Sequence, residues 1–153
     1  MKVSTGIRNH LLVTGTLKAA LDGGVIRIYG ATTSQAAADA LIPATADASI
    51  GTAVLLATIS NNGAGTGINL DTTAASGVIS KAAAEVWKGT RAAGYPSFAR
   101  FSALADTGAE STVEKRLQMT VGVLGKEIIV SSSPWSAGDE QRIDQFYVGV
   151  PGE

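Results

Sequence analysis

His10 is the only histidine in the chain, so any catalytic imidazole must be this one. A nucleophilic triad needs a hydroxyl or thiol beside the imidazole and a carboxylate that orients it. The chain has no cysteine, and His10 stands between Asn9 and Leu11 with no acidic or nucleophilic neighbour in sequence. We therefore interpret His10 as a histidine on a helix surface or at an interface.

The run Gly63-x-Gly65-x-Gly67 has the composition of a phosphate-binding loop. It lacks the Lys-Ser/Thr pair of a Walker loop. The short apolar stretch Ile68 to Leu70 follows it, where a phosphate-binding loop would open a helix. The run therefore predicts a turn and not a nucleotide site.

Two groups of carboxylates have side chains of the kind that bind calcium or flank a glycosidic bond. Neither group has EF-hand spacing, and the chain contains no HExxH pair. We interpret both as solvated acidic turns, and we expect no tightly bound metal, no cofactor and no enzymatic activity. The groups are Asp106, Glu110 and Glu114, and Asp139, Glu140 and Asp144.

Trp87 and Tyr95 are the candidates for an aromatic platform, which a carbohydrate-binding site requires. Aromatic residues make up only 5% of the chain. Because so few are present, a core or interface position suits Trp87 better than an exposed one. An aromatic platform for carbohydrate binding is the alternative interpretation of Trp87 and Tyr95.

The composition indicates one domain with a large contact surface. A chain of 153 residues can bury one core without disulfides. Twelve basic residues are scattered among thirteen acidic ones, which argues against nucleic acid as a direct partner. The apolar run Leu11 to Val13 is broken at Thr14, so we expect neither a signal peptide nor a membrane span, and a protein made in a cytoplasm.

The clearest secondary-structure element in the sequence is the stretch Arg116 to Val123, where every second side chain is apolar. That period is typical of a strand with one buried face. Tyr95 to Ala103 alternates in the same way, and the turn residues Asp106 to Gly108 lie between the two stretches. We therefore predict an antiparallel hairpin here.

Further short strands, with no βαβ alternation, predict an all-β (mainly β) fold, a two-sheet β-sandwich of jelly-roll topology. Residues 1–24 form a helical N-terminal segment, and residues 25–153 form the sandwich, which carries a long loop at 30–51. Asp71 to Gly77 is predicted to be a turn. The further strands are Val25–Tyr29, Thr52–Ser60, Ile68–Leu70, Val78–Lys81, Lys126–Ser131 and Gln141–Val150. The predicted core includes Ile26, Ile28, Phe101, Leu117, Met119, Val121, Phe146 and Val148.

The loop 30–51 is rich in Ala, Thr and Ser, and Ser34 to Leu41 within it can form a short helix. Two interpretations stay open for this loop. It is either a flexible excursion over the surface or a binding segment.

The N-terminal segment predicts two short helices, the first capped by Ser4 or Thr5 and ended by Gly15, the second capped by Thr16. The strand Thr52–Ser60 is apolar on both faces, so its outer side needs cover. We expect the N-terminal segment to pack on its own sheet or to lie across a neighbouring protein, with the second favoured. The predicted interface residues are Ile7, Leu11, Leu12, Leu17, Val54, Leu56 and Trp87.

Eight short motifs occur in order along most of the chain. They are Thr5–Leu12, Leu17–Tyr29, Pro43–Ala48, Gly77–Lys81, Glu85–Trp87, Arg100–Phe101, Asp106–Gly108 and Ile143–Tyr147. Taken together, the sequence resembles a family of small virion proteins of tailed bacteriophages, most closely the capsid cement or decoration proteins of short-tailed phages. It departs from that pattern between Gly30 and Ile42, where it carries an added Ala/Thr-rich segment.

The resemblance implies a jelly-roll sandwich on the outer surface of a capsid, assembled in the cytoplasm of a bacterial host. It implies a non-enzymatic protein that bridges major capsid subunits, with the major capsid protein and copies of itself as partners. Neither a membrane nor direct nucleic acid binding is expected. The alternative is a carbohydrate- or host-binding module of the tail or neck apparatus.

Overall fold

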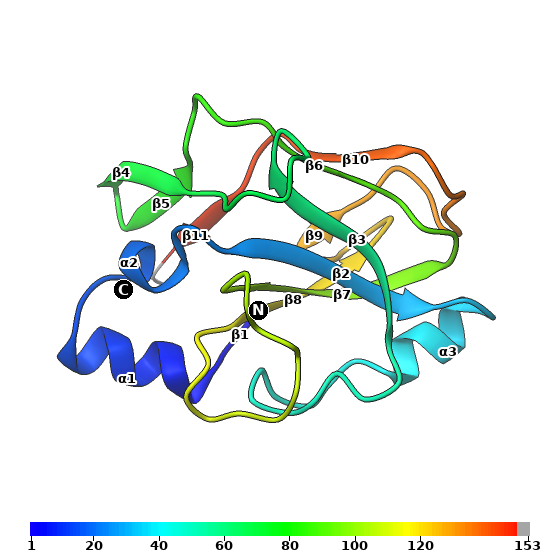
Figure 1. The fold of residues 1–153 in the computed structure, drawn as a ribbon, viewed down its shortest axis with the longest axis horizontal. Coiled ribbons are helices and arrows are strands. Elements are labelled where there is room, and N and C mark those ends of the chain that lie inside the picture. The colour runs from blue at the N-terminus through cyan, green and yellow to red at the C-terminus, as the bar shows by residue number, and fades with distance from the viewer. Residues whose placement is uncertain (150–153) are drawn as a thin grey trace.

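The computed structural model describes residues 1–149, which form eleven strands and three short helices (Figure 1). The predicted position Val150 lies outside the described residues. The elements are β1 (Lys2–Val3), α1 (Thr5–Val13), α2 (Leu17–Leu21), β2 (Val25–Ala31), α3 (Gln35–Ala40), β3 (Val54–Asn61), β4 (Leu70–Ala75), β5 (Val78–Lys81), β6 (Trp87–Thr90), β7 (Tyr95–Ser102), β8 (Leu117–Gly122), β9 (Ile128–Ile129), β10 (Glu140–Ile143) and β11 (Tyr147–Gly149).

The strands form two sheets, which confirms the predicted all-β sandwich. The larger sheet has the order β1-β8-β7-β2-β3-β6-β10, with β9 parallel to one end of β8. The smaller sheet has the order β11-β5-β4. The strands divide eight to three between the sheets, and the jelly-roll topology stays a prediction.

The predicted hairpin is confirmed as β7 and β8, which pair in antiparallel register from Phe98↔Thr120 to Phe101↔Leu117. All eight predicted core residues are buried. Trp87 lies in the same core, with its ring centroid 5.8 Å from that of Phe101 and 5.4 Å from that of Phe146. Apolar alternation on the central strands therefore located the core correctly.

The N-terminal segment is part of the folded unit. β1 pairs with β8, Ser4 caps α1 by accepting a hydrogen bond from the Ile7 amide, and Ile7 is fully buried. Thr16 caps α2, as predicted. The segment packs on its own sheet, the first of the two expectations, because its strand, its cap and its first helical turn are bound within its own chain. A contact of the segment with a neighbouring protein stays a prediction.

Two predicted strands are corrected. Lys126–Ser131 contributes only the two residues of β9, because the side chain of Glu127 turns back to bond Thr120. Gln141–Val150 divides into β10, which pairs with β6, and β11, which pairs with β5, because the chain crosses from one sheet to the other.

The predicted turn at 71–77 is shorter than expected. β4 continues to Ala75, and Ser76 and Gly77, both with positive φ, make the hairpin turn into β5. Ile68 forms only an isolated bridge to Gly24.

The long loop 30–51 is neither a free excursion nor wholly irregular. The short helix predicted within Ser34–Leu41 forms as α3, and Ser34 is its N-cap. Beyond α3 the segment 43–48 lies on the outer face of the large sheet, where its carbonyls accept hydrogen bonds from buried side chains of β7 and β8. Arg100 Nη2 donates to Ala48 O at 2.7 Å, and Gln118 Nε2 donates to Pro43 O at 2.8 Å.

A buried ion pair completes this outer layer. Arg116 is bound by both carboxylate oxygens of Asp106, at 2.7 and 2.6 Å, and both side chains are almost fully buried. Burial by itself raises the pKa of Asp106, but the hydrogen bonds from Arg116 and the Gly108 amide hold it below its ordinary value. The interpretation of Asp106 as a solvated turn carboxylate is therefore wrong.

We expect Ile7→Ala to cost about 2–5 kcal/mol in free energy of unfolding, because it empties a fully buried site. Leu12→Ala on the same helix should change it by less than about 0.5 kcal/mol, because Leu12 is 83% exposed. Urea unfolding followed by circular dichroism measures both. Equal costs for the two variants would contradict the placement of α1.

Asp106→Ala should destabilise the protein by about 3–5 kcal/mol, because it leaves Arg116 buried without its counter-charge. Glu140→Ala breaks the exposed pair with Lys88, at 2.9 Å, and should leave the urea midpoint almost unchanged. The same unfolding measurement applies. A mild effect of Asp106→Ala would mean that the ion pair does not hold the outer layer.

Candidate interaction surface

Nine of the exposed apolar side chains fall into two groups at opposite ends of the long axis of the molecule, whereas Leu104 and Val113 of the loop between β7 and β8 belong to neither. In Figure 1 this axis is horizontal, with α1, α2 and the β4–β5 hairpin at the left and α3 with the start of β3 at the right. A soluble domain exposes single apolar residues as a matter of course, but grouped ones mark contact sites.

The left-end group is centred on α1 and the N-terminus. Leu12 and Val13 are 83% and 87% exposed at the end of α1, and Met1, Val3 and Leu11 are about half exposed beside them. The helix carries no acidic residue in its first turn, and His10 is the one basic residue in its last turn. This end therefore offers a projecting apolar helix tip.

The right-end group begins where β3 leaves the long loop. Val54 and Leu55 are 41% and 46% exposed there, and Val123 and Leu124 of the loop after β8 are exposed as well. Val123 shares a pocket with Gln35 and Asp39 of α3, which places that loop at the same end.

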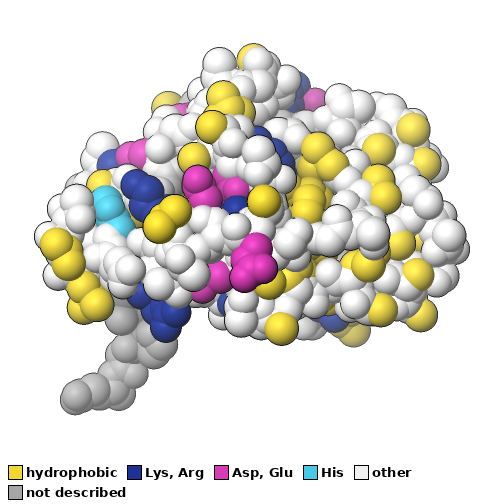
Figure 2. All heavy atoms as spheres, turned by 60° about the horizontal axis from the view of Figure 1, so that its bottom comes forward, with side chains coloured by type: hydrophobic (Ala, Val, Ile, Leu, Met, Phe, Trp, Pro, Cys, Tyr) yellow, Lys and Arg dark blue, Asp and Glu magenta, His cyan; other side chains and the backbone are white. Residues whose placement is uncertain are grey.

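Charged side chains are sparse around the right-end group. Between residues 32 and 60 the only charged residues are Asp39 and Asp47, and the Asp47 carboxylate is bound by the amide and hydroxyl of Thr5. Figure 2 shows this part of the surface at the right, with apolar and small side chains and few charged ones. Such a surface loses little hydration when another protein covers it.

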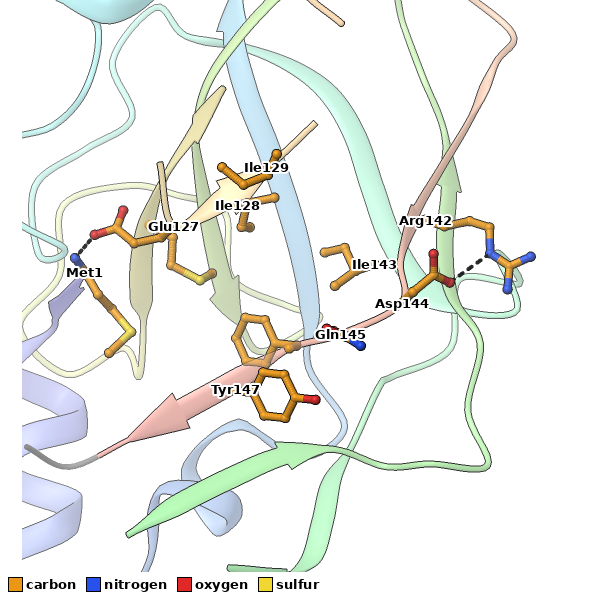
Figure 3. Close-up of a pocket in the computed structure, with 11 residues that line it drawn as sticks. Met1, Glu127, Ile128, Ile129, Arg142, Ile143, Asp144, Gln145 and Tyr147 are labelled. Carbon is orange, nitrogen blue, oxygen red and sulfur yellow. Dashed lines mark hydrogen bonds and ion pairs between the residues drawn. The ribbon is translucent and has the colours of Figure 1, made fainter. Parts of the chain in front are cut away.

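A groove lies between the two sheets, next to the left-end group. It consists of two hollows of about 660 and 520 Å³ that share Met1. Ile129 and Tyr147 line the first hollow, and Val3 and Gly149 line the second. Figure 3 shows the first, with Met1, Glu127, Ile128 and Ile129 on one side and Gln145 and Tyr147 on the other. We call this feature the inter-sheet groove.

Glu127 holds one wall of the groove together. Its carboxylate accepts hydrogen bonds from the amide and hydroxyl of Thr120 and from the N-terminal amine of Met1. Partial burial acts to raise the pKa of Glu127, but these bonds lower it to about 2. The side chain thus fills the gap on the edge of β8 between β1 and β9.

Of the predicted interface residues, the structure leaves three exposed. Leu11 and Leu12 belong to the left-end group and Val54 to the right-end group, whereas Leu17 is half-buried and lines the inter-sheet groove. Ile7, Leu56 and Trp87 are buried in the core and are not available to a partner. The two-faced apolarity of Thr52–Ser60 is covered within the chain from Leu56 onwards, where Gly94 lies close to the Leu56 side chain, whereas Val54 and Leu55 at the start of the strand stay exposed.

Sequence reasoning missed half of the right-end group. Val123 was assigned to the buried parity of β8, but the strand ends at Gly122 and Val123 is half exposed. Leu124-Gly125 directly after it is a turn signal that, read alongside the hydrophobic run, marks an exposed apolar loop.

The residues that could do chemistry are not brought together. Within residues 1–149 no three acidic or histidine side chains meet as metal ligands. Gly63 and Gly65 lie in a turn with positive φ, as predicted. Both tryptophans are buried, Trp135 beneath the guanidinium of Arg91, so neither offers a face for sugar stacking. No helix in the described part of the chain is both long and apolar enough to cross a membrane.

The comparisons with known proteins give no match to this chain. No protein-family model matches the chain, and neither the curated proteins nor the solved structures contain a match.

The low pKa of Glu127 predicts that the free energy of unfolding depends on pH in the acid range. Because its folded-state pKa of about 2 lies below the ordinary 4.5, its ionised form contributes stability that is complete above about pH 4.5 and is lost as the pH falls towards 2. Glu127→Gln should therefore be less stable than the parent at pH 7, and the difference should shrink at pH 3. Urea midpoints at both pH values measure it. A difference that is constant with pH would contradict this role of the carboxylate.

Proposed function

We propose that this chain is a non-enzymatic structural protein of a tailed-phage virion, a cement or decoration protein that stabilises the head by bridging major capsid subunits. The observation that carries the proposal is the separation of two apolar groups to opposite ends of one rigid sandwich. A bridging protein needs two contact surfaces that face different neighbours, and a rigid body between them so that binding at one end restrains the other.

Three further features support the proposal. The motifs that resemble phage cement proteins run through most of the chain. The N-terminal segment is paired with β8 through β1, and the segment 43–48 is hydrogen-bonded to Arg100 of β7, so both are held on the large sheet. The right-end surface has few charges, which suits close packing against a protein lattice.

The carbohydrate-binding alternative has no comparable support. It required an exposed tryptophan platform, and Trp87 is 1% exposed. Among the described aromatic side chains Tyr147 is the exposed one, at 62%, and a single tyrosine does not form a platform.

The test uses heads of the encoding phage that lack this protein, to which the purified chain is added back. We expect the parent chain to raise the temperature at which the heads release DNA, measured with a DNA-binding dye. Leu12→Asp with Val13→Asp, and separately Val54→Asp with Leu55→Asp, should each abolish that rise, because a bridge fails when either end is lost.

Val113→Asp is the matched control, because Val113 is 79% exposed but lies in the loop between β7 and β8, in neither group. It should behave like the parent. If both double variants still protect the heads, or if the parent chain does not bind them, the proposal is wrong.

A further inference from the structure

We propose that the inter-sheet groove accepts an extended, uncharged strand from a different protein, which pairs with the free edge of β11. The proposal does not depend on the virion role. It rests on the direction of backbone groups on the strands that border the groove.

β11 is an edge strand, since only β5 pairs with it among the described residues. Lys81 N donates to Phe146 O at 3.0 Å, and the register continues as Tyr147↔Ser80 and Val148↔Ile79. In an antiparallel pair alternate residues bond to the same neighbour. Phe146 and Val148 therefore bond β5, while the amides and carbonyls of Tyr147 and Gly149 point away from it.

The opposite border of the groove is also an open edge. Ser4 N donates to Arg116 O at 2.9 Å, so the alternation in β1 turns the amide and carbonyl of Val3 away from β8. Val130 N donates to Gly122 O at 3.0 Å, which leaves Ile129 pointing outward from β9 in the same way. Glu127 interrupts this edge between the two strands, so it cannot pair with one continuous strand.

β11 is therefore the edge that a strand can pair with. Its residues Tyr147 and Gly149 are two apart and present amides and carbonyls at regular strand spacing. Both residues line the groove. An added strand would place alternate side chains against Met1, Val3 and Ile129, which are apolar and 40–58% exposed.

The lining sets the chemistry of the incoming strand. The second hollow is lined almost entirely by apolar and small residues, with Lys18 as its one charged side chain. In the first hollow the Glu127 carboxylate is bound by Thr120 and Met1, and Arg142 is paired with Asp144 at 3.4 Å. The carboxylates that line the first hollow are thus already paired, and they offer no partner to a charged strand. A strand with apolar residues at alternate positions fits this lining.

A second copy of this chain is not the donor. Every strand in residues 1–149 is already paired in a sheet, and the exposed apolar segment Val123–Leu124 is a two-residue turn region between β8 and β9. The edge strands β4, β10 and β11 are hydrogen-bonded within a sheet on their other side, so none of them can enter the groove of another copy as a single strand. This is strand addition to a sheet edge by a heterologous partner.

The probe is a set of dye-labelled, end-blocked seven-residue peptides with Val, Ile or Phe at alternate positions and Thr or Ser between them. We expect at least one to bind the full-length protein in fluorescence anisotropy with a Kd below about 1 mM. N-methylation of the peptide amides that face β11 should abolish binding, because it removes the donors to the Tyr147 and Gly149 carbonyls. Hydrogen exchange should show that the bound peptide protects the backbone amides of Tyr147 and Gly149.

Gly149→Pro and Gly149→Ala form the matched pair. Proline removes the outward amide of Gly149 from the edge and should weaken peptide binding at least about tenfold, whereas alanine keeps the amide and should change it less than about twofold. Equal unfolding midpoints for the two variants show that the fold is retained; if Gly149→Pro is unstable, the N-methylated peptides and the exchange measurement decide.

Three outcomes overturn the proposal. They are no binding by any peptide of the set at about 1 mM, equal binding by the N-methylated peptides, and self-association of the chain that the peptides displace, which would make a second copy the occupant. Because purified protein and peptides are used, failure here leaves the head-stabilisation test unaffected.

Discussion

The buried ion pair between Arg116 and Asp106 is the contact on which the outer layer of this protein depends. It joins the start of β8 to the loop between β7 and β8. Arg100 and Gln118, its neighbours on the same sheet face, bond the carbonyls of segment 43–48. This strand face is covered by the chain itself, because the carbonyls of the loop accept hydrogen bonds from Arg100 Nη2 and Gln118 Nε2. Arg100 Nη1 is the one donor of these two side chains that is buried without a partner.

This arrangement also connects the N-terminal helix to the covering layer. Asp47 of the covering segment accepts two hydrogen bonds from Thr5, which fixes the start of α1 to the same layer. The helix tip at the left end is therefore anchored by the outer layer that also runs to α3 at the right end. Rigid separation of two apolar surfaces is what a bridge between lattice subunits requires, and it is the physical basis of the proposed function.

Sequence reasoning succeeded where one periodicity decided the outcome. The alternation in β7 and β8 located the hairpin and the core, and Ser4, Thr16 and Ser34 each marked a helix start. It failed where a residue's partner is remote in sequence. From the sequence alone, Asp106 looks like a turn carboxylate, because its partner Arg116 is brought beside it only by the fold. Likewise, nothing near Glu127 in sequence indicates that it binds the N-terminal amine. The surface groups were only half found, because exposure at Val123 depends on where β8 ends.

The most direct measurement of the proposed role is a cryo-electron microscopy reconstruction, at side-chain resolution, of intact particles of the phage that we propose encodes this chain. The account predicts density for this sandwich on the outside of the head, with α1 against one major capsid subunit and the start of β3 against another. A particle without such density, or a sandwich that touches the lattice through one end alone, would contradict it.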